Sequence, residues 1–226
     1  MKIISWNVER PKINQFEKIN FIENIIKENN ADLIFLRETN SILNFGKEYF
    51  KLESNILPEF FENQTYFKGE NRVTIYSKYE ILEEIKTYDN FTCISGKIKT
   101  EFGELVLFGS IIGSFGGRDQ YFKNDLLNQK KEIENLKSNI CFSGDFNISF
   151  SGFKYPSKVI VSETMKFFED NDLAILTKEN KDCAIHIVLN NEFLKDKIYT
   201  NKMIEIDRKF SDHNLVICEI SANKKK

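Results

Sequence analysis

Polar side chains that could carry out chemistry lie at the ends of several strand-like apolar runs in this 226-residue sequence. The set comprises Asn7, Glu38, Asp145, Asn147, Asp212 and His213. Taken singly, each of these residues is also of a type that is common in turns, helix caps or exposed strand ends. Taken together, acids, amides and an imidazole at strand boundaries are the groups needed for a site assembled along one edge of a sheet.

The available ligand types restrict the metal that such a site could hold. The chain has only 2 histidines, which excludes a zinc site built from several histidines. Its 4 cysteines lie far apart, without the CxxC spacing of a metal or redox pair. Carboxylate and amide oxygens instead favour Mg²⁺, or Mn²⁺. If the strand geometry continues beyond Gly144, Asp145 and Asn147 point the same way.

The elements that must position these residues are a mixture of strands and helices. Strands are predicted at 2–8, 31–39, 72–78, 91–100, 103–112, 139–145, 183–190 and 214–221. Helices are predicted at 13–30, within 41–55, at 119–137 and at 162–172, with Ser162 as an N-cap. The run at 31–39 is continuously apolar, which indicates a strand buried on both faces and paired in parallel with the first strand. The strands at 91–100 and 103–112 are expected to form a hairpin.

Composition indicates a globular chain that can bury a sizeable core, with 41% hydrophobic and 29% charged residues. The net charge of −2 means that nucleic-acid binding would need a local basic face. Because no repeat or linker divides the sequence, we expect one domain at 1–222 and a basic tail at 223–226. No apolar run has the length of a signal peptide or a membrane span, so a cytoplasmic location is expected.

Five segments together carry a family resemblance that spans nearly the whole chain. They are "ISWNVE", "ADLIFLRET", "VTIYSKYEI", "FSGDFN" and "FSDHN". In this order they resemble the signatures of the endonuclease/exonuclease/phosphatase superfamily, which includes exonuclease III-type and DNase I-like enzymes. The resemblance implies an α/β fold, a four-layer α/β/β/α sandwich of two mixed β-sheets flanked by helices. It also implies metal-dependent hydrolysis of phosphate esters, with nucleic acid as the expected substrate.

The resemblance assigns expected roles to the polar residues. Glu38 is the first expected metal ligand, since magnesium needs only one or two protein carboxylates. By similarity, Asp212 and Asn7 lie close to the metal. Asp145 then orients or deprotonates the attacking water. Two further residues act on the phosphoryl group: Asn147 holds one of its oxygens, or Asp145 itself, and His213 donates a hydrogen bond to it.

Three residues are expected to bind substrate. Arg37 replaces the commoner Gln before the metal-binding Glu, and it either holds a phosphate or pairs with Glu38 and weakens the metal site. Ser110 lies beside Ile111, at a place where many members carry Tyr or His. Arg118 lies in the glycine-rich segment 113–122, which is either a flexible surface loop or a substrate loop.

One carboxylate that the family pattern leads us to expect is missing. Ile185 stands where an Asp usually bonds to the catalytic His, so His213 is expected to be less charged near neutrality. Asp182 could substitute if its loop bends back, and His186 has an ordinary interpretation as a strand residue. The leading hypothesis is a magnesium-dependent nuclease. The alternatives are a phosphatase or phosphodiesterase acting on a small phosphorylated metabolite or lipid headgroup, and a weakly active or inactive binding homologue.

Overall fold

The computed structural model describes residues 1–115, 120–136 and 138–223, which form two six-stranded sheets and a separate hairpin. The first sheet has the order β13-β14-β1-β2-β6-β3, with strands at Lys197–Ile204, Leu215–Ala222, Lys2–Asn7, Leu33–Asn40, Glu70–Ser77 and Phe50–Glu53. The second has the order β11-β12-β10-β9-β8-β7, with strands at Leu173–Ile175, Ile185–Asn190, Ile140–Asp145, Gly103–Ile111, Cys93–Thr100 and Ile81–Ile85. The hairpin pairs β4 (Phe60–Phe61) with β5 (Gln64–Thr65).

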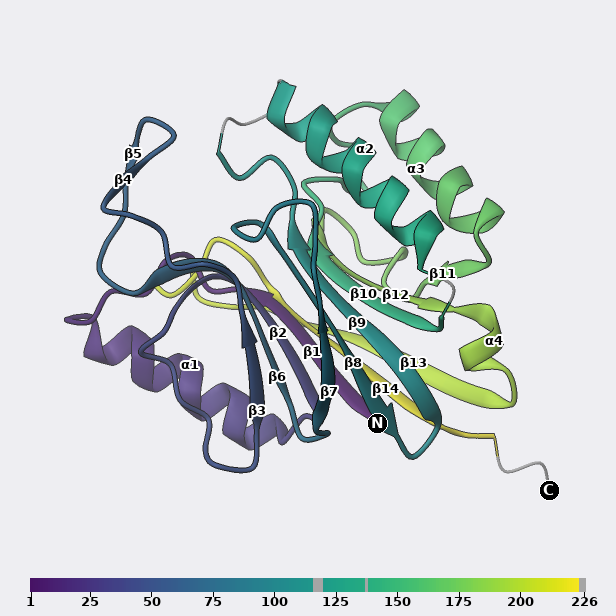
Figure 1. The fold of residues 1–226 in the computed structure, drawn as a ribbon, viewed down its shortest axis with the longest axis horizontal. Coiled ribbons are helices and arrows are strands. Elements are labelled where there is room, and N and C mark those ends of the chain that lie inside the picture. The colour runs from purple at the N-terminus through teal and green to yellow at the C-terminus, as the bar shows by residue number, and fades with distance from the viewer. Residues whose placement is uncertain (116–119, 137, 224–226) are drawn as a thin grey trace.

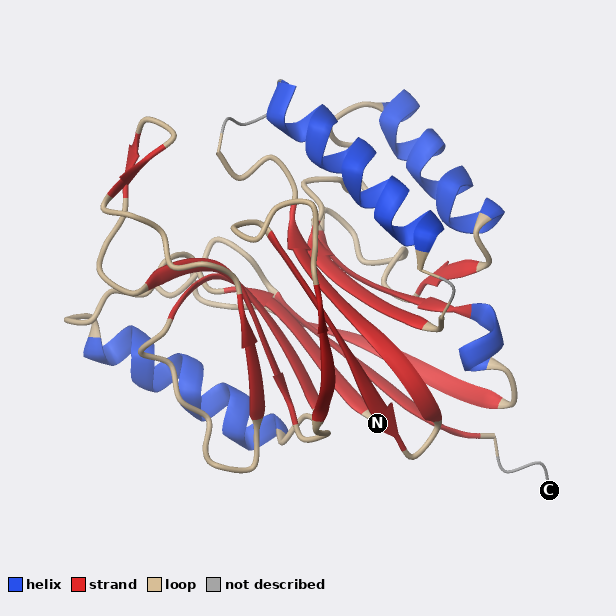
Figure 2. Cartoon of the chain, viewed as in Figure 1, coloured by secondary structure: helices blue, strands red, loops and turns tan. Residues whose placement is uncertain are grey.

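Helices cover the outer faces of the two sheets (Figure 1). Helix α1 (Phe16–Asn29) packs on the first sheet, and α2 (Gln120–Asn135) and α3 (Lys158–Asp170) pack on the second (Figure 2). The short α4 (Asn191–Leu194) follows β12. Both sheets contain parallel and antiparallel pairs. This arrangement is the four-layer sandwich of mixed sheets that the sequence predicted.

Alternation along β2 explains how one strand serves two hydrophobic layers. Leu33 and Phe35 belong to the core between the sheets, and Ile34 and Leu36 belong to the core under α1. Successive side chains of a strand point to opposite faces, so a strand with a layer on each side needs apolar residues at every position. The continuous apolar run in the sequence is the result.

Strand pairing brings the ends of several strands to one edge of the sandwich. β1 and β2 are parallel, with Asn7 paired to Arg37 at their carboxyl ends. In the second sheet β10 runs parallel to β9, and its last residue, Asp145, pairs with Ile111. β14 runs antiparallel to β1, so the segment that precedes Leu215 returns to the end of β1. The polar residues of the sequence motifs are therefore collected at this edge.

Some predicted elements differ from the observed ones. The helix predicted within 41–55 is wrong, because the described chain there forms turns and strand β3. Helix α3 begins at Lys158 and not at 162, because Ser157 is its N-cap and accepts a bond from Ile160 N at 3.2 Å. Strand β13 was not predicted. Most of its side chains are partly or fully exposed, so it lacks the alternating apolar pattern of a half-buried strand.

Three remaining expectations concern the cysteines, membrane-spanning segments and the basic tail. All four cysteines are buried and free, as their apolar surroundings in the sequence suggested. Within the described ranges, no helix is both long enough and apolar enough to cross a membrane. Most of the predicted basic tail, residues 224–226, lies outside the described part of the chain.

Candidate active site

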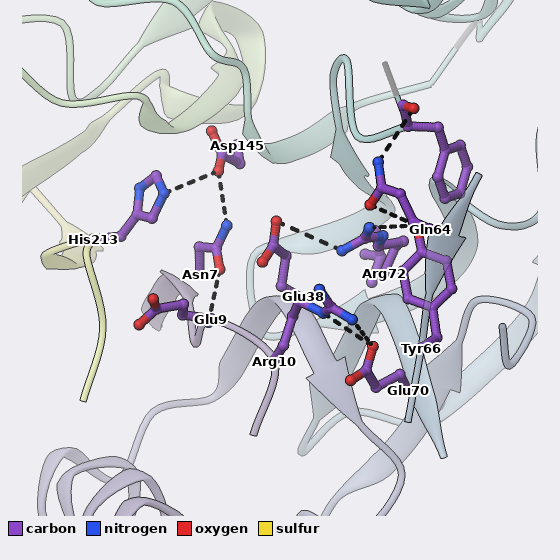
Figure 3. A network of polar contacts seen from close by, with 12 residues as sticks. Asn7, Glu9, Arg10, Glu38, Gln64, Tyr66, Glu70, Arg72, Asp145 and His213 are labelled. Carbon is purple, nitrogen blue, oxygen red and sulfur yellow. Dashed lines mark hydrogen bonds and ion pairs between the residues drawn. The ribbon is translucent and has the colours of Figure 1, made fainter. Parts of the chain in front are cut away.

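Asp145, at the end of β10, is the centre of a polar cluster formed by three segments that are distant in sequence (Figure 3). Its carboxylate is 2% exposed and accepts a hydrogen bond from Asn7 Nδ2 at 3.0 Å on Oδ2. His213 Nε2 lies 3.6 Å from the same oxygen, which is an ion-pair distance and not a hydrogen bond. The backbone N–H of Asn147 donates to Oδ1 at 3.2 Å. An acid, an amide and an imidazole therefore converge at one edge of the sandwich, and they come from both sheets instead of the single sheet edge that was expected.

The end of β1 fixes the orientation of both Asn7 and His213. Asn7 Oδ1 accepts a bond from Glu9 N at 2.9 Å, which leaves its Nδ2 free to donate to the carboxylate of β10. Ser211 Oγ donates to Asn7 O at 2.7 Å and accepts from His213 N at 3.0 Å. Trp6 Nε1 donates to His213 O at 3.1 Å. The loop that carries the imidazole is thus bonded to the strand that carries the amide.

Glu38 lies in β2 with a left-handed backbone, at φ 46°. Such a conformation is costly for a residue other than glycine and is often found at functional sites. The Glu38 side chain is 25% exposed, and its Oε1 lies 3.6 Å from Arg72 Nη1. Burial raises the pKa of Glu38, the Arg72 charge opposes this rise, and the negative charge of Asp145 adds to it. Glu38 is therefore a partly buried carboxylate in a site with an excess of acids.

The imidazole of His213 lies between two carboxylates. Its Nε2 is 3.5 Å from Asp212 Oδ1, in addition to its contact with Asp145. The Asp212 side chain is 65% exposed, and the imidazole is 23% exposed. Asp212 also contributes to the raised pKa of Glu38, so the two acids are close enough to interact. Nε2 therefore faces two carboxylates, one buried and one exposed.

The residues fit a hard divalent cation better than any other metal. Within the described residues, no group of three or more histidine, cysteine, aspartate or glutamate side chains forms a ready metal cluster. Magnesium does not need one, because it keeps several waters and takes substrate oxygens as ligands. Burial raises the pKa of Glu38, the Arg72 charge opposes this rise, and the negative charges of Asp145 and Asp212 add to it, so three carboxylates share one electrostatic neighbourhood. A site of this composition suits Mg²⁺ or Mn²⁺.

The substrate-binding roles expected for Arg37 and Ser110 do not fit their positions. Arg37 is fully buried between the sheets, where it donates to Ser5 Oγ at 2.9 Å, Ser143 Oγ at 2.7 Å and Ser110 O at 3.2 Å. Burial lowers the pKa of Arg37 to about 9. Ser110 is also fully buried, and its hydroxyl donates to Gln129 Oε1 at 3.0 Å. Both residues join layers of the sandwich and have no surface from which to bind a phosphate.

Asn147 lies just after the end of β10. Asn147 has φ 49°, so the strand geometry ends before it and its side chain does not follow that of Asp145. Instead, Asn147 Nδ2 donates to Ile112 O at 2.7 Å and joins the chain after β10 to the end of β9. Its side-chain role toward a phosphoryl oxygen stays a prediction, and its backbone N–H holds Asp145. Arg118 lies outside the described residues.

Ile185 lies directly opposite Asp145 in the antiparallel pair β12–β10. Opposite residues of such a pair place their side chains on the same face, about 5 Å apart at Cβ. The Ile185 side chain is 1% exposed, so an apolar group borders the central carboxylate where the family pattern has an acid. The Asp182 carboxylate accepts a hydrogen bond from Phe153 N at 2.7 Å, so this acid is bonded to the loop after β10.

His186 is a structural residue of β12. It is fully buried, with Nδ1 2.9 Å from Thr177 Oγ1 and Nε2 2.9 Å from Ile148 O. Burial lowers its pKa to about 4. The interpretation of His186 as an ordinary strand residue is thereby confirmed.

Sequence reasoning missed several residues that shape the site. The sequence indicates Arg72 only as the first residue of the strand predicted at 72–78, and Ser211 only as part of the segment "FSDHN". Lys18, on α1, is 8% exposed and donates to Glu9 O at 2.7 Å. Burial lowers its pKa, and the nearby charges of Glu9, Asp212 and Glu38 oppose this. The only signal for Lys18 in the sequence is a cation on the inner face of an amphipathic helix.

Comparison with known proteins identifies the fold. No protein-family model and no curated protein sequence matches the chain. Among solved structures, an AP endonuclease from Archaeoglobus fulgidus is 15% identical, with a TM-score of 0.71 over 98% of this chain and 100% of that one. An endonuclease/exonuclease/phosphatase family protein from Leptotrichia buccalis is 17% identical, with a TM-score of 0.66 over 98% and 99% of the two chains. Beta toxin from Staphylococcus aureus, in a mutant structure with bound magnesium ions, is 16% identical, with a TM-score of 0.62 over 96% and 98%. The chain has the fold of endonuclease/exonuclease/phosphatase proteins, as its motifs predicted.

Proposed function

We propose that this protein is a divalent-metal-dependent phosphoesterase and, more specifically, a nuclease that cleaves phosphodiester bonds of nucleic acid. One observation carries the proposal. Asp145 Oδ2 lies 3.0 Å from Asn7 Nδ2 and 3.6 Å from His213 Nε2, at an edge of the sandwich that also presents Glu38. The likeness in fold to an AP endonuclease supports the same reaction class.

Each residue can take a distinct part in hydrolysis. Glu38, with Asp212 and Asn7, would hold Mg²⁺ or Mn²⁺, which polarises a phosphoryl oxygen. Asp145 holds the attacking water by a hydrogen bond and accepts its proton. Asn7 keeps that carboxylate oriented through its 3.0 Å bond. His213 donates from Nε2 to an oxygen of the phosphoryl group, where a preorganised donor contributes about 10²–10³ in rate.

Local charge supports a polyanionic substrate despite the net charge of −2. Arg72 lies beside Glu38, and the negative charges of Glu38 and Asp212 act to raise the pKa of Lys18. Arg208 donates to the backbone oxygen of Asp212. Cations of this kind attract phosphates in a sequence-independent manner. These three cations next to the acidic site favour an anionic ligand, nucleic acid or a small phosphate ester, over a neutral one.

Two alternatives follow from particular observations. A small phosphate ester, such as a phosphorylated metabolite or lipid headgroup, would use the same residues and would need fewer cations around them. A binding function with little chemistry is favoured by Ile185, which places an apolar side chain beside Asp145. The expected cytoplasmic location stays a prediction.

The test is a metal titration and a substrate panel with matched variants. Glu38→Gln removes the ligand charge, so we expect magnesium affinity measured by calorimetry to be largely lost with the fold intact. Glu84→Gln, an exposed acid on β7, is the control and should bind metal as the wild type does. Unchanged magnesium binding in Glu38→Gln would show that the metal site is elsewhere.

The panel consists of plasmid DNA, single-stranded DNA, RNA, bis-p-nitrophenyl phosphate and inositol phosphates. A nuclease should cleave one of the polymers with the highest efficiency, and cleavage should depend on magnesium. Preference for inositol phosphates would support the small-ester alternative. Metal binding without turnover of any member of the panel would support the binding alternative.

A further inference from the structure

Arg72 is a buried cation directed at the proposed metal ligand Glu38 (Figure 3). It belongs to β6, and it lies across from Glu38 between the paired positions Arg37–Val73 and Thr39–Asn71. Its side chain is 3% exposed, and its Nη1 lies 3.6 Å from Glu38 Oε1. The register of β6 on β2 therefore places Arg72 next to Glu38, and burial restricts the movement of its side chain.

Aromatic rings hold the Arg72 guanidinium in place. Its central carbon lies 4.9 Å from the centroid of the Tyr66 ring and 5.5 Å from that of Phe115. Nη2 donates to the Tyr66 hydroxyl at 3.0 Å, and this hydroxyl in turn donates to Gln64 Oε1 at 3.1 Å. The hairpin strand β5 and the segment that follows it therefore fix the direction of the cation.

The contact between Arg72 and Glu38 is an attraction of charges without a close hydrogen bond. Charge-assisted N–H···O bonds are typically about 2.7–2.9 Å long, and this separation is 3.6 Å. Arg72 Nε is buried and has no partner. In contrast, Arg10 bonds Glu70 Oε2 through Nε at 3.1 Å and lies 3.0 Å from it through Nη2. Arg72 is thus near enough to neutralise Glu38 without occupying its oxygens.

We infer that Arg72 is a built-in counter-charge for Glu38 that keeps metal affinity low until an anionic phosphoryl group enters the site. The inference rests on the proposed function, since it needs a divalent cation at Glu38. The fixed charge of Arg72 repels a cation that arrives at Glu38. Water screens this repulsion only in part, because Arg72 is buried. A phosphoryl group adjacent to Glu38 adds negative charge, which offsets Arg72. Metal and phosphate then bind cooperatively, and each raises the affinity of the other by the same factor.

The experiment is a calorimetric titration of the whole chain with Mn²⁺ at low ionic strength, with and without inorganic phosphate. Arg72→Gln removes the charge, and Arg72→Met removes it while retaining apolar contact with the two rings. Arg72→Lys keeps the charge. Lys12→Gln is the matched control, because Lys12 Nζ lies 4.0 Å from the Phe67 ring centroid and has no contact with Glu38 among the described interactions. Near-ultraviolet circular dichroism establishes that each variant is folded.

We expect Arg72→Gln and Arg72→Met to bind Mn²⁺ about tenfold more tightly than the wild type in the absence of phosphate. The factor by which phosphate tightens Mn²⁺ binding should shrink in both variants and persist in Arg72→Lys and Lys12→Gln. Folded variants with wild-type Mn²⁺ affinity and wild-type coupling would overturn the inference and leave the proposed function standing. If the wild type does not bind Mn²⁺, or if Glu38→Gln binds it as tightly as the wild type does, the proposed function is wrong, and the inference falls with it.

Discussion

Replacing Asp145 by asparagine separates its chemical role from its structural one. The amide has nearly the size of the carboxylate but cannot accept a proton at pH 7. One of its two terminal atoms also becomes a donor. If the amide oxygen keeps the bond from Asn147 N, the new NH₂ group faces Asn7 Nδ2, which already donates at 3.0 Å. Asp145→Asn therefore removes a base and creates a pair of opposed donors.

The two effects have different sizes and different readouts. Loss of a general base typically lowers turnover by about 10²–10⁴-fold. This corresponds to about 2.7–5.4 kcal/mol in the activation free energy. A buried donor without an acceptor costs about 1–3 kcal/mol in the free energy of unfolding, and Asp145 is 2% exposed. Turnover and stability must therefore be measured together, by steady-state hydrolysis of bis-p-nitrophenyl phosphate and by urea denaturation.

The double variant Asn7→Asp/Asp145→Asn isolates the structural part. It exchanges donor and acceptor across the same 3.0 Å contact, so a hydrogen bond can form again in the opposite direction. We expect the free energy of unfolding to return most of the way to the wild-type value. Turnover should stay low, because the carboxylate now lies at position 7 and not at the end of β10.

Three results would refute this reasoning. Wild-type turnover in folded Asp145→Asn would exclude a role for the carboxylate in proton transfer. Recovery of turnover in the double variant would show that only the hydrogen bond matters. A loss of magnesium affinity equal to that of Glu38→Gln would make Asp145 a metal ligand.

The remaining predictions concern the surroundings of the site and the core. Ile185→Asp places a carboxylate opposite Asp145, where the family pattern has an acid, and should raise turnover about tenfold; unchanged turnover in a protein that thermal melts show to be folded would contradict this. The pKa of His186 is lowered from 6.5 to about 4, so between these values the unfolded chain binds a proton that the folded chain does not. The unfolding free energy should therefore fall with falling pH, by up to about 3 kcal/mol, and His186→Asn should flatten the slope in urea titrations. Ser143→Ala removes the acceptor of a 2.7 Å bond from buried Arg37 and should cost about 1.5–3 kcal/mol by the same denaturation assay.

Local pattern in the sequence predicted the long helices and the central strands, and the family resemblance supplied their layered arrangement. The helix near residues 13–30 was predicted from apolar residues at helical spacing, and the buried strand β2 from a continuous apolar run. These signals are local because a helix or strand with a buried face must repeat apolar residues with its own period. They failed where burial is weak. The exposed edge strand β13 shows no such repeat, and the segment around β3 was mistaken for a helix.

The sequence also indicated which polar residues gather at the site. Asn7 and Asp145 end their strands, Glu38 lies near the end of β2, and His213 lies just before β14. The parallel pairing of β1 with β2 requires Asn7 and Glu38 to lie near one another. Asp145 lies in the other sheet, so its contact with Asn7 also depends on how the two sheets pack.

Only the tertiary structure decided the roles of the arginines. Arg37 and Glu38 are adjacent in sequence, yet one is fully buried between the sheets and the other is partly exposed at the edge. A strand with apolar neighbours on both faces gives no sign of which face a polar residue takes. Arg72 is 34 positions from Glu38 in the sequence and reaches it through the antiparallel register of β6 on β2. Register depends on the packing of whole sheets, because a shift of one residue would move every side chain to the opposite face.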